Sequence, residues 1–302
     1  MSANRQLFII GSGRCGTAAL ARLLGTFEGV EAHHEYCIGH TQPLSVLYHA
    51  GHLTTPQAAI KLRRLHGAAV EYSQAEVWAD CSNKLSFLVK PLTQLFPDAR
   101  FIWLTRDGRR VVSSFYHKLR DECYVPGLVA TLAETLYNPY ATLPPPEKRW
   151  WWPVPTDAEI RGQFMKWGQF QQVAWYWGEV NWAILKSFEN QVELRNFDTA
   201  SNQVLFAPIE RMAHPETGPA LLGSLLEFAG VDFKVTDTVS LWRQFLVRPH
   251  NVSKPVSYPL TREEQGLFWN TPGVASMMQR LGYEGEDYAV NYNPNWILGV
   301  EK

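Results

Sequence analysis

The sequence is poor in cysteine, and its four cysteines, Cys15, Cys37, Cys81 and Cys123, form no CxxC pair. This spacing excludes a zinc ribbon and is typical of a reducing compartment. Long apolar runs are also missing, since no stretch approaches the roughly 20 apolar residues of a membrane span. The opening MSANRQ has no long apolar region behind it, unlike a signal peptide. We therefore expect a cytoplasmic protein without a membrane span.

Excess charge of either sign is missing too. The chain has 28 lysines and arginines against 29 aspartates and glutamates, a formal net charge of −1. A nucleic-acid-binding protein would carry a basic stripe, so we expect no nucleic acid partner. Any anionic ligand must be bound by a few local arginines and lysines. With 302 residues, 46% of them hydrophobic, the chain is long enough to bury a substantial core.

Strand, turn and helix follow one another along the chain. Residues 6–10 predict a buried strand, and a glycine-rich turn occupies 11–16. A helix is predicted next, with Gly25 near its end, because apolar residues recur at helical spacing at Leu20, Leu23, Leu24 and Phe27. Further strands are predicted at 76–84, 101–104 and 203–212, and further helices at 111–119, at 219–230 and after the capping box at 261–264. We predict one α/β domain over residues 1–302, with three layers around a central parallel sheet.

One segment, 137–182, departs from this alternation. Its first half is rich in proline and predicts a surface loop, whereas its second half places Trp167, Trp175, Trp177 and Trp182 on one helix. Such tryptophans belong more often to a core or a lid than to a cofactor site, and a place in an acceptor pocket is the alternative.

The turn at 11–16 lacks the lysine of a nucleotide triphosphatase. Gly11 and Gly16 have the spacing of a Walker A loop, but Thr17 stands where the lysine would be, and the basic residue is Arg14 inside the loop. Backbone amides and an arginine still form a site for phosphate or sulfate, and a metal-free anion is favoured. The alternatives are a dinucleotide-type turn, because Gly11, Gly13 and Gly16 match GxGxxG, or purely structural glycines.

A second candidate anion site follows the strand at 101–104. Arg106 stands at the carboxyl end of that strand, where ligands bind in open α/β sheets. Ser114 lies two turns along the next helix, and we expect it to face the same anion. The alternative is a surface Arg106–Asp107 pair and an ordinary helix-face serine.

These two motifs carry a family resemblance. FIIGSGRCGTAAL (8–20) resembles the 5′-phosphosulfate loop of sulfotransferases that use 3′-phosphoadenosine 5′-phosphosulfate (PAPS), in the branch with RSGT in the loop that includes tyrosylprotein, carbohydrate and bacterial enzymes. FIWLTRDGRRVVSSF (101–115) resembles their 3′-phosphate element. The resemblance implies a P-loop kinase-like sulfotransferase fold, PAPS as sulfuryl donor and no metal. It implies cofactor contacts from Gly11, Ser12, Gly13, Arg14, Cys15, Gly16, Thr17, Ala18, Arg106 and Ser114. Cys15 and Ala18 depart from the branch, which has serine and often threonine there.

The same resemblance names residues for catalysis. Glu35, in VEAHHEYC (30–37), has the spacing from Arg14 of the base in tyrosylprotein sulfotransferases, and His34 and His33 are the alternatives because other branches use histidine. Lys84, in DCSNKLSF (80–87), matches a lysine that touches the sulfuryl group. With Arg14 it would stabilise charge on the bridging oxygen. An ordinary exposed lysine is the alternative reading of Lys84.

Weaker matches lie towards the C-terminus. HNVSKPV (250–256) resembles a cofactor loop and would bring Ser253 and Lys254 to the nucleotide. KVTDTV (234–239) matches half of a dimer motif whose final glutamate is replaced by Arg243, which leaves a homodimer open as an alternative to a monomer. No residue that stacks on adenine can be assigned.

We predict that residues 1–120 mainly bind the cofactor and that 137–182 lies on the acceptor side. The predicted acceptor is a small molecule, lipid or carbohydrate, apolar, amphiphilic or sugar-containing, with a hydroxyl group. A nucleotide-dependent kinase and a non-catalytic nucleotide-binding module are the alternative functions.

Overall fold

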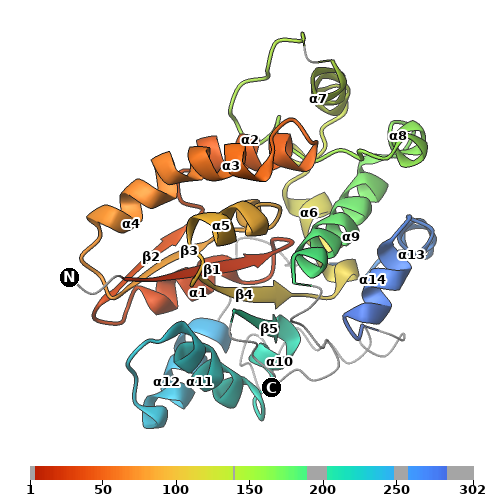
Figure 1. Ribbon diagram of the computed structural model, residues 1–302. Coiled ribbons are helices and arrows are strands. Elements are labelled where there is room, and N and C mark those ends of the chain that lie inside the picture. Colours follow the sequence, from red (N-terminus) through yellow and green to blue (C-terminus); the bar gives the residue numbers. More distant parts are fainter. Residues whose placement is uncertain (1–3, 139, 189–202, 248–257, 284–302) are drawn as a thin grey trace.

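A five-stranded parallel sheet organises the computed structural model, which describes residues 4–138, 140–188, 203–247 and 258–283 (Figure 1). The strands lie in the order β2-β3-β1-β4-β5. Their bounds are β1 Arg5–Gly11, β2 Val30–His34, β3 Val77–Cys81, β4 Arg100–Thr105 and β5 Val204–Pro208. All five residues of β3 and of β5 are buried, as expected for parallel strands covered on both faces.

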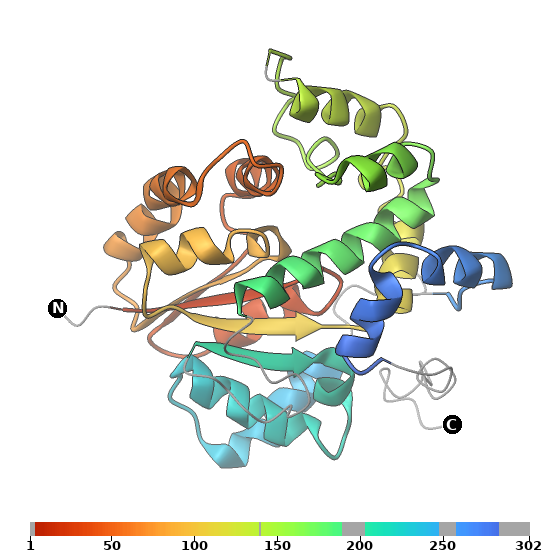
Figure 2. The same ribbon diagram turned by 45° about the vertical axis from the view of Figure 1, so that its right-hand side comes forward.

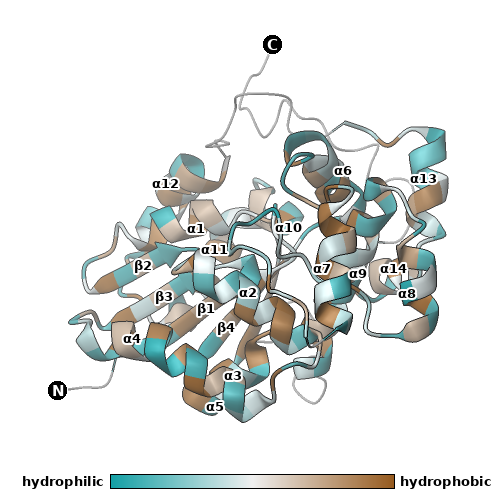
Figure 3. Cartoon of the chain, turned by 90° about the horizontal axis from the view of Figure 1, so that it is seen from above, coloured by the Kyte–Doolittle hydropathy of each residue, from teal (hydrophilic) through white to brown (hydrophobic). Residues whose placement is uncertain are grey.

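Helices cover both faces of this sheet (Figures 1 and 2). One face carries α1 Thr17–Leu24, α10 Ile209–Ala213, α11 Gly218–Ala229 and α12 Thr238–Trp242, with the short turns η3 Val235–Asp237 and η4 Arg243–Val247. The other face carries α2 Ile38–His49, α3 Thr55–Leu62, η1 Arg63–Gly67, α4 Ala68–Tyr72, η2 Asn83–Leu85, α5 Val89–Leu95 and α9 Gln169–Ser187. The remaining helices are α6 Gly108–Lys118, α7 Leu128–Tyr137, α8 Ala158–Phe164, α13 Arg262–Trp269 and α14 Val274–Arg280. Figure 3 shows apolar and polar residues side by side on helices such as α3 and α5, which lie between sheet and solvent.

The chain changes direction across the sheet between β1 and β4. From β1 it passes to β2, and from β4 it passes to β5 on the other side, while β1 and β4 pair directly, with Ile10 opposite Trp103. Connections that leave neighbouring strands in opposite directions open a crevice at the carboxyl ends, where ligands bind in open α/β sheets. The loops after β1 and β4 therefore meet at the switch point.

The predicted architecture, three layers with a central parallel sheet, is confirmed. The capping box at Thr261 is confirmed as well, and α11 ends at Gly230, whose backbone is left-handed. The strand predicted over 203–212 is too long, since β5 ends at Pro208 and Ile209 begins a helical turn. The edge strand β2 was not predicted. Its first four residues are only partly buried and His34 is exposed, so the strand lacks the apolar run of the central strands.

Two boundaries differ from the sequence prediction. Phe27 lies beyond α1, which is capped by Gly25, and Trp167 lies before α9. Trp175 and Trp177 are buried in the core, the more common of the two roles weighed for them. None of the described helices has both the length and the apolar composition needed to cross a membrane. All four cysteines are free thiols.

Candidate anion and catalytic site

The loop after β1 depends on close backbone approaches that only glycine allows. A Cβ on Gly11 would lie 2.3 Å from the carbonyl oxygen of Leu104 on the paired strand. Gly13 has a φ of +85°, and a Cβ there would lie 2.9 Å from Nδ2 of Asn83 and 3.1 Å from the ring of Phe115. Glycine at these positions lets the loop turn tightly against β4, η2 and α6.

The backbone amides of this loop are available for an anion. The amide of Gly11 donates to Oγ of Ser86, and Ser86 donates back to the Gly11 carbonyl, which fixes the start of the loop. By contrast, the amides from Gly13 to Thr17 donate to no other group in the part of the chain that the structure describes. They precede and begin α1, so the unpaired N–H groups and the dipole of this helix favour negative charge here.

The two anion motifs meet directly. The guanidinium of Arg14 donates from Nε to Oγ of the fully buried Ser114 at 2.9 Å, and Arg106 donates from a terminal nitrogen to the carbonyl oxygen of Arg14 at 2.8 Å. Burial lowers the pKa of Arg14, and the nearby positive charge of Arg106 lowers it further. Two guanidinium groups are thus held together, as an anion site requires.

Lys118 adds a third cation that the sequence prediction missed. It lies one turn after Ser114 on α6, and partial burial, followed by the charges of Arg14 and Arg106, lowers the pKa of its ammonium group. Among the described residues, no carboxylate forms an ion pair with Arg14, Arg106 or Lys118. The spacing of four residues from Ser114 on a helix was the signal that could have identified it.

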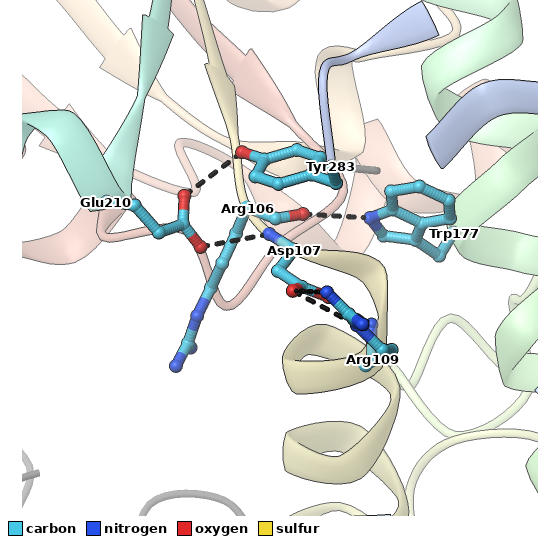
Figure 4. A network of polar contacts seen from close by, with 6 residues as sticks. All are labelled: Arg106, Asp107, Arg109, Trp177, Glu210 and Tyr283. Carbon is cyan, nitrogen blue, oxygen red and sulfur yellow. Dashed lines mark hydrogen bonds and ion pairs between the residues drawn. The ribbon is translucent and has the colours of Figure 1, made fainter. Parts of the chain in front are cut away.

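A buried polar network supports the backbone beside Arg106 (Figure 4). One oxygen of Glu210 accepts from the amide of Asp107 at 3.0 Å, and the other accepts from the hydroxyl of Tyr283 at 3.0 Å. Nε1 of Trp177 donates to the carbonyl oxygen of Arg106 at 3.3 Å. In Figure 4 the guanidinium of Arg106 extends away from this network, so its backbone is fixed while its charge faces the loop side.

Asp107 has a structural role in this network. Its carboxylate caps α6 by accepting from the amide of Arg109, and it also forms an ion pair with the Arg109 side chain at 2.7 Å. Burial raises the pKa of the Glu210 carboxyl. The network therefore explains the Arg106–Asp107 sequence without making Asp107 a ligand contact.

The side chains of Ser12 and Cys15 face each other inside the loop. Their Oγ and Sγ atoms lie 3.3 Å apart, the thiol donates to the carbonyl of Gly13, and burial raises the pKa of Cys15 to about 11. A ligand contact from either residue would come from its main chain. Thr17 is buried beside the loop, whereas Ala18 is half-buried.

Glu35 and Lys84 lie at the carboxyl ends of β2 and β3. Lys84 is 8% exposed, its ammonium lies 4.1 Å from the ring centroid of Trp152, and burial lowers its pKa to about 8. Burial would raise the pKa of Glu35, but the positive charges of Lys84 and Lys148 outweigh this effect and lower it. Lys148 forms an ion pair with Glu35, with Nζ 2.8 Å from Oε2. Lys84 is thus not an ordinary exposed lysine.

The two histidines considered as the base lie in different environments. His34 is hydrogen-bonded from Nε2 to Oγ1 of Thr17 at 3.3 Å, and burial lowers its pKa. His33 instead pairs with Glu31 at 2.8 Å and packs against Tyr36 and Trp78. The structure therefore brings His34, but not His33, into contact with the loop.

Two predicted contacts cannot be placed, because Ser253 and Lys254 lie outside the described residues. Within the described ranges, no three histidine, cysteine, aspartate or glutamate side chains gather into a group able to hold a metal ion. Besides Lys118, sequence reasoning missed Lys148 and Glu210. No local signal marked either of them, because each acts on a strand end that is distant in sequence.

Comparison with known proteins yields one family match. Residues 6–124 match the model of the sulfotransferase family. A search of curated proteins found no significant match. Solved structures with a similar chain path include a sulfotransferase from Alicyclobacillus acidocaldarius (16% identity, 97% of this chain and 99% of that one covered, TM-score 0.48). Sulfotransferase STF9 from Mycobacterium avium has 14% identity, with 97% of this chain and 78% of that one covered and a TM-score of 0.49.

A third structure is the sulfotransferase domain of the Synechococcus PCC 7002 olefin synthase. It has 15% identity, with 97% of this chain and 98% of that one covered and a TM-score of 0.46.

The family match covers the loop after β1, Arg14, Arg106 and Ser114. It also covers Glu35, Lys84 and Lys118, so the cationic site and the strand ends beside it fall within one matched region. The region of the chain that matches the sulfotransferase family model therefore holds all these groups.

Proposed function

We propose that this protein transfers a sulfuryl group from PAPS to a hydroxyl group of an acceptor. The observation that carries the proposal is the joining of two anion sites at the switch point of the sheet. Arg14 of the first site donates to Ser114 of the second, and Arg106 of the second donates to the backbone of the first. A nucleoside with an anionic group at both its 3′ and 5′ positions matches this pair of sites better than a triphosphate tail does.

The residues present fit such a donor. The amides from Gly13 to Thr17, together with Arg14, would hold the 5′-phosphosulfate, and glycine leaves room for the backbone to approach it. Arg106, Ser114 and Lys118 would hold the 3′-phosphate. When bound, the donor supplies a sulfuryl group whose bond to the 5′-phosphate oxygen breaks as the acceptor oxygen attacks the sulfur.

The chain contributes proton transfer and charge stabilisation. Glu35 takes the proton of the acceptor hydroxyl. The lowered pKa of its carboxyl keeps Glu35 anionic at neutral pH, as this role requires. Lys84 and Arg14 stabilise negative charge on the oxygen that leaves. His34 is the alternative base, and its hydrogen bond to Thr17 also suits it to orient the loop.

The segment 137–182 forms the acceptor side in this proposal. It contributes Lys148 to Glu35 and the ring of Trp152 to Lys84, so both catalytic side chains are in contact with it. The aromatic residues of this segment, such as Trp152 beside Lys84, favour an acceptor that is apolar, amphiphilic or sugar-containing.

Calorimetric titration with adenosine 3′,5′-bisphosphate tests the donor, alongside ATP with and without Mg²⁺. We expect metal-independent binding of the bisphosphate. Replacing Arg106 by Ala should weaken it by roughly 10- to 100-fold, because charge-assisted hydrogen bonds contribute about 1.5–3 kcal/mol. Arg64→Ala, which removes an exposed arginine on η1, is the matched control and should leave affinity unchanged.

Binding of Mg-ATP without binding of the bisphosphate would contradict the proposal and favour a kinase. Binding of the bisphosphate without any sulfuryl transfer from PAPS, even to water, would favour the non-catalytic module.

A further inference from the structure

Lys148 is held in place by more than its ion pair with Glu35. Its carbonyl oxygen accepts from Nε2 of Gln42 at 3.2 Å, and the same nitrogen donates to the carbonyl of Trp151. Gln42 is 1% exposed and lies within α2, the helix that begins just after Glu35. The proline-rich segment is therefore fixed to the helix next to the proposed base.

The following residues fix the same segment from its other side. Nε1 of Trp152 donates to the carbonyl of Glu122 at 2.7 Å, and the hydroxyl of Tyr124 donates to the carbonyl of Pro153 at 2.6 Å. Because the backbone is held at Lys148 itself and again from Trp151 to Pro153, the ammonium of Lys148 reaches Glu35 from a fixed origin.

The ion pair uses only one oxygen of Glu35. Lys148 contacts Oε2, and no described residue donates a hydrogen bond to Oε1. The backbone of Glu35 is in the left-handed region, with a φ of 56°, and the amide of the next residue, Tyr36, donates to the buried carboxylate of Asp80 at 3.1 Å. Backbone and Oε2 are thus both fixed, and one carboxylate oxygen is left for another ligand.

We propose that Lys148 is a positioning residue of the active site, which holds Oε2 of Glu35 and so presents Oε1, as an anion, to the hydroxyl of the acceptor. This role rests on the proposed function, in which Glu35 is the base. The groups that face Glu35 are Lys148 from the proline-rich segment, Lys84 from η2, His34 from β2, Arg14 from the loop and Tyr176 from α9. Lys84 is hardly exposed, whereas the Lys148 side chain is 45% exposed on the acceptor side.

The direct test is the titration of the Glu35 carboxyl, followed by NMR in protein labelled with ¹³C at glutamate Cδ. The signal is assigned by its loss in Glu35→Gln. In Lys148→Met the pKa of Glu35 should rise, because burial remains and one opposing positive charge is removed. Lys148→Arg should restore the wild-type titration. Arg149→Met, which removes the same charge from the neighbouring exposed residue, should leave it unchanged.

The pH profile of PAPS hydrolysis, with water as the acceptor, provides the catalytic readout. The acid limb should move to higher pH in Lys148→Met, in the same direction as the Glu35 titration, while the thermal midpoint stays near that of Arg149→Met. An unmoved Glu35 titration, or a moved titration with an unmoved acid limb, would overturn the role of Lys148. These results are separate from the donor assignment, because the carboxyl titration needs no nucleotide and bisphosphate binding is measured independently.

Discussion

Replacing Gly13 by Ala gives the sharpest test of the loop geometry. The methyl group would lie 2.9 Å from Nδ2 of Asn83, 3.1 Å from the ring of Phe115 and 3.2 Å from Cγ of Asn83. A left-handed residue with a Cβ costs about 1–2 kcal/mol, and overpacking of this kind costs about 1–3 kcal/mol. Because Asn83 can shift somewhat, we expect the free energy of unfolding to fall by about 2–4 kcal/mol.

Urea unfolding at pH 7.5 measures this loss, and Gly39→Ala is the matched control. Gly39 lies in the first turn of α2, and an added Cβ would meet no atom within 4 Å, so alanine there should be neutral or stabilise by up to about 1 kcal/mol. Gly13→Ala should also weaken binding of adenosine 3′,5′-bisphosphate, whereas Gly39→Ala should not. A change in unfolding free energy below about 0.5 kcal/mol for Gly13→Ala would refute the packing argument.

Three further predictions follow from other residues. Since burial lowers the pKa of Lys84 to about 8, PAPS turnover should fall about fivefold between pH 8 and pH 9, and Lys84→Arg, which stays charged, should lose this base limb. Burial also lowers the pKa of His49 from 6.5 to about 4, so below pH 6.5 only the unfolded state takes up the proton and stability falls. Urea unfolding at pH 7.5 and pH 5 should show a loss of about 2 kcal/mol that is absent in His49→Phe, and equal losses in both proteins would exclude His49 as the source. Thr261→Ala removes a side chain that accepts from the Glu264 amide, and it should lower the free energy of unfolding by about 1 kcal/mol in the same assay. No change in this free energy would contradict a stabilising role of the cap of α13.

The central part of the fold could be predicted from the sequence because its signals are local. The apolar run before Gly11 and the one before Arg106 each mark a buried parallel strand. Arg106 follows β4 directly, and Arg14 lies in the loop that follows β1. Parallel strands end at one edge of the sheet, so the meeting of the two loops followed from the pattern.

The edge of the site could not be predicted in the same way. β2 is an edge strand whose residues, such as His33, are only partly buried, and half-exposed strands lack a clear apolar pattern. The contact between Lys148 and Glu35 depends on how a proline-rich segment folds back over α2, which no periodicity encodes. The catalytic roles of Glu35, Lys84 and Arg14 stay predictions, as does the membership of the RSGT branch.

The network around Glu210 also bears on how the molecule folds. The Tyr283 hydroxyl lies 3.1 Å from that of Thr105 across a sequence separation of 178 residues, and the amide of Asp107 reaches Glu210 across 103 residues. Contacts of such separation close large loops and form late in folding. A nascent chain that has emerged only as far as residue 124 therefore has the glycine loop and Arg106 in its sequence but lacks the partners that fix the strand end. We expect a fragment of residues 1–124 to be unable to assemble the anion site by itself.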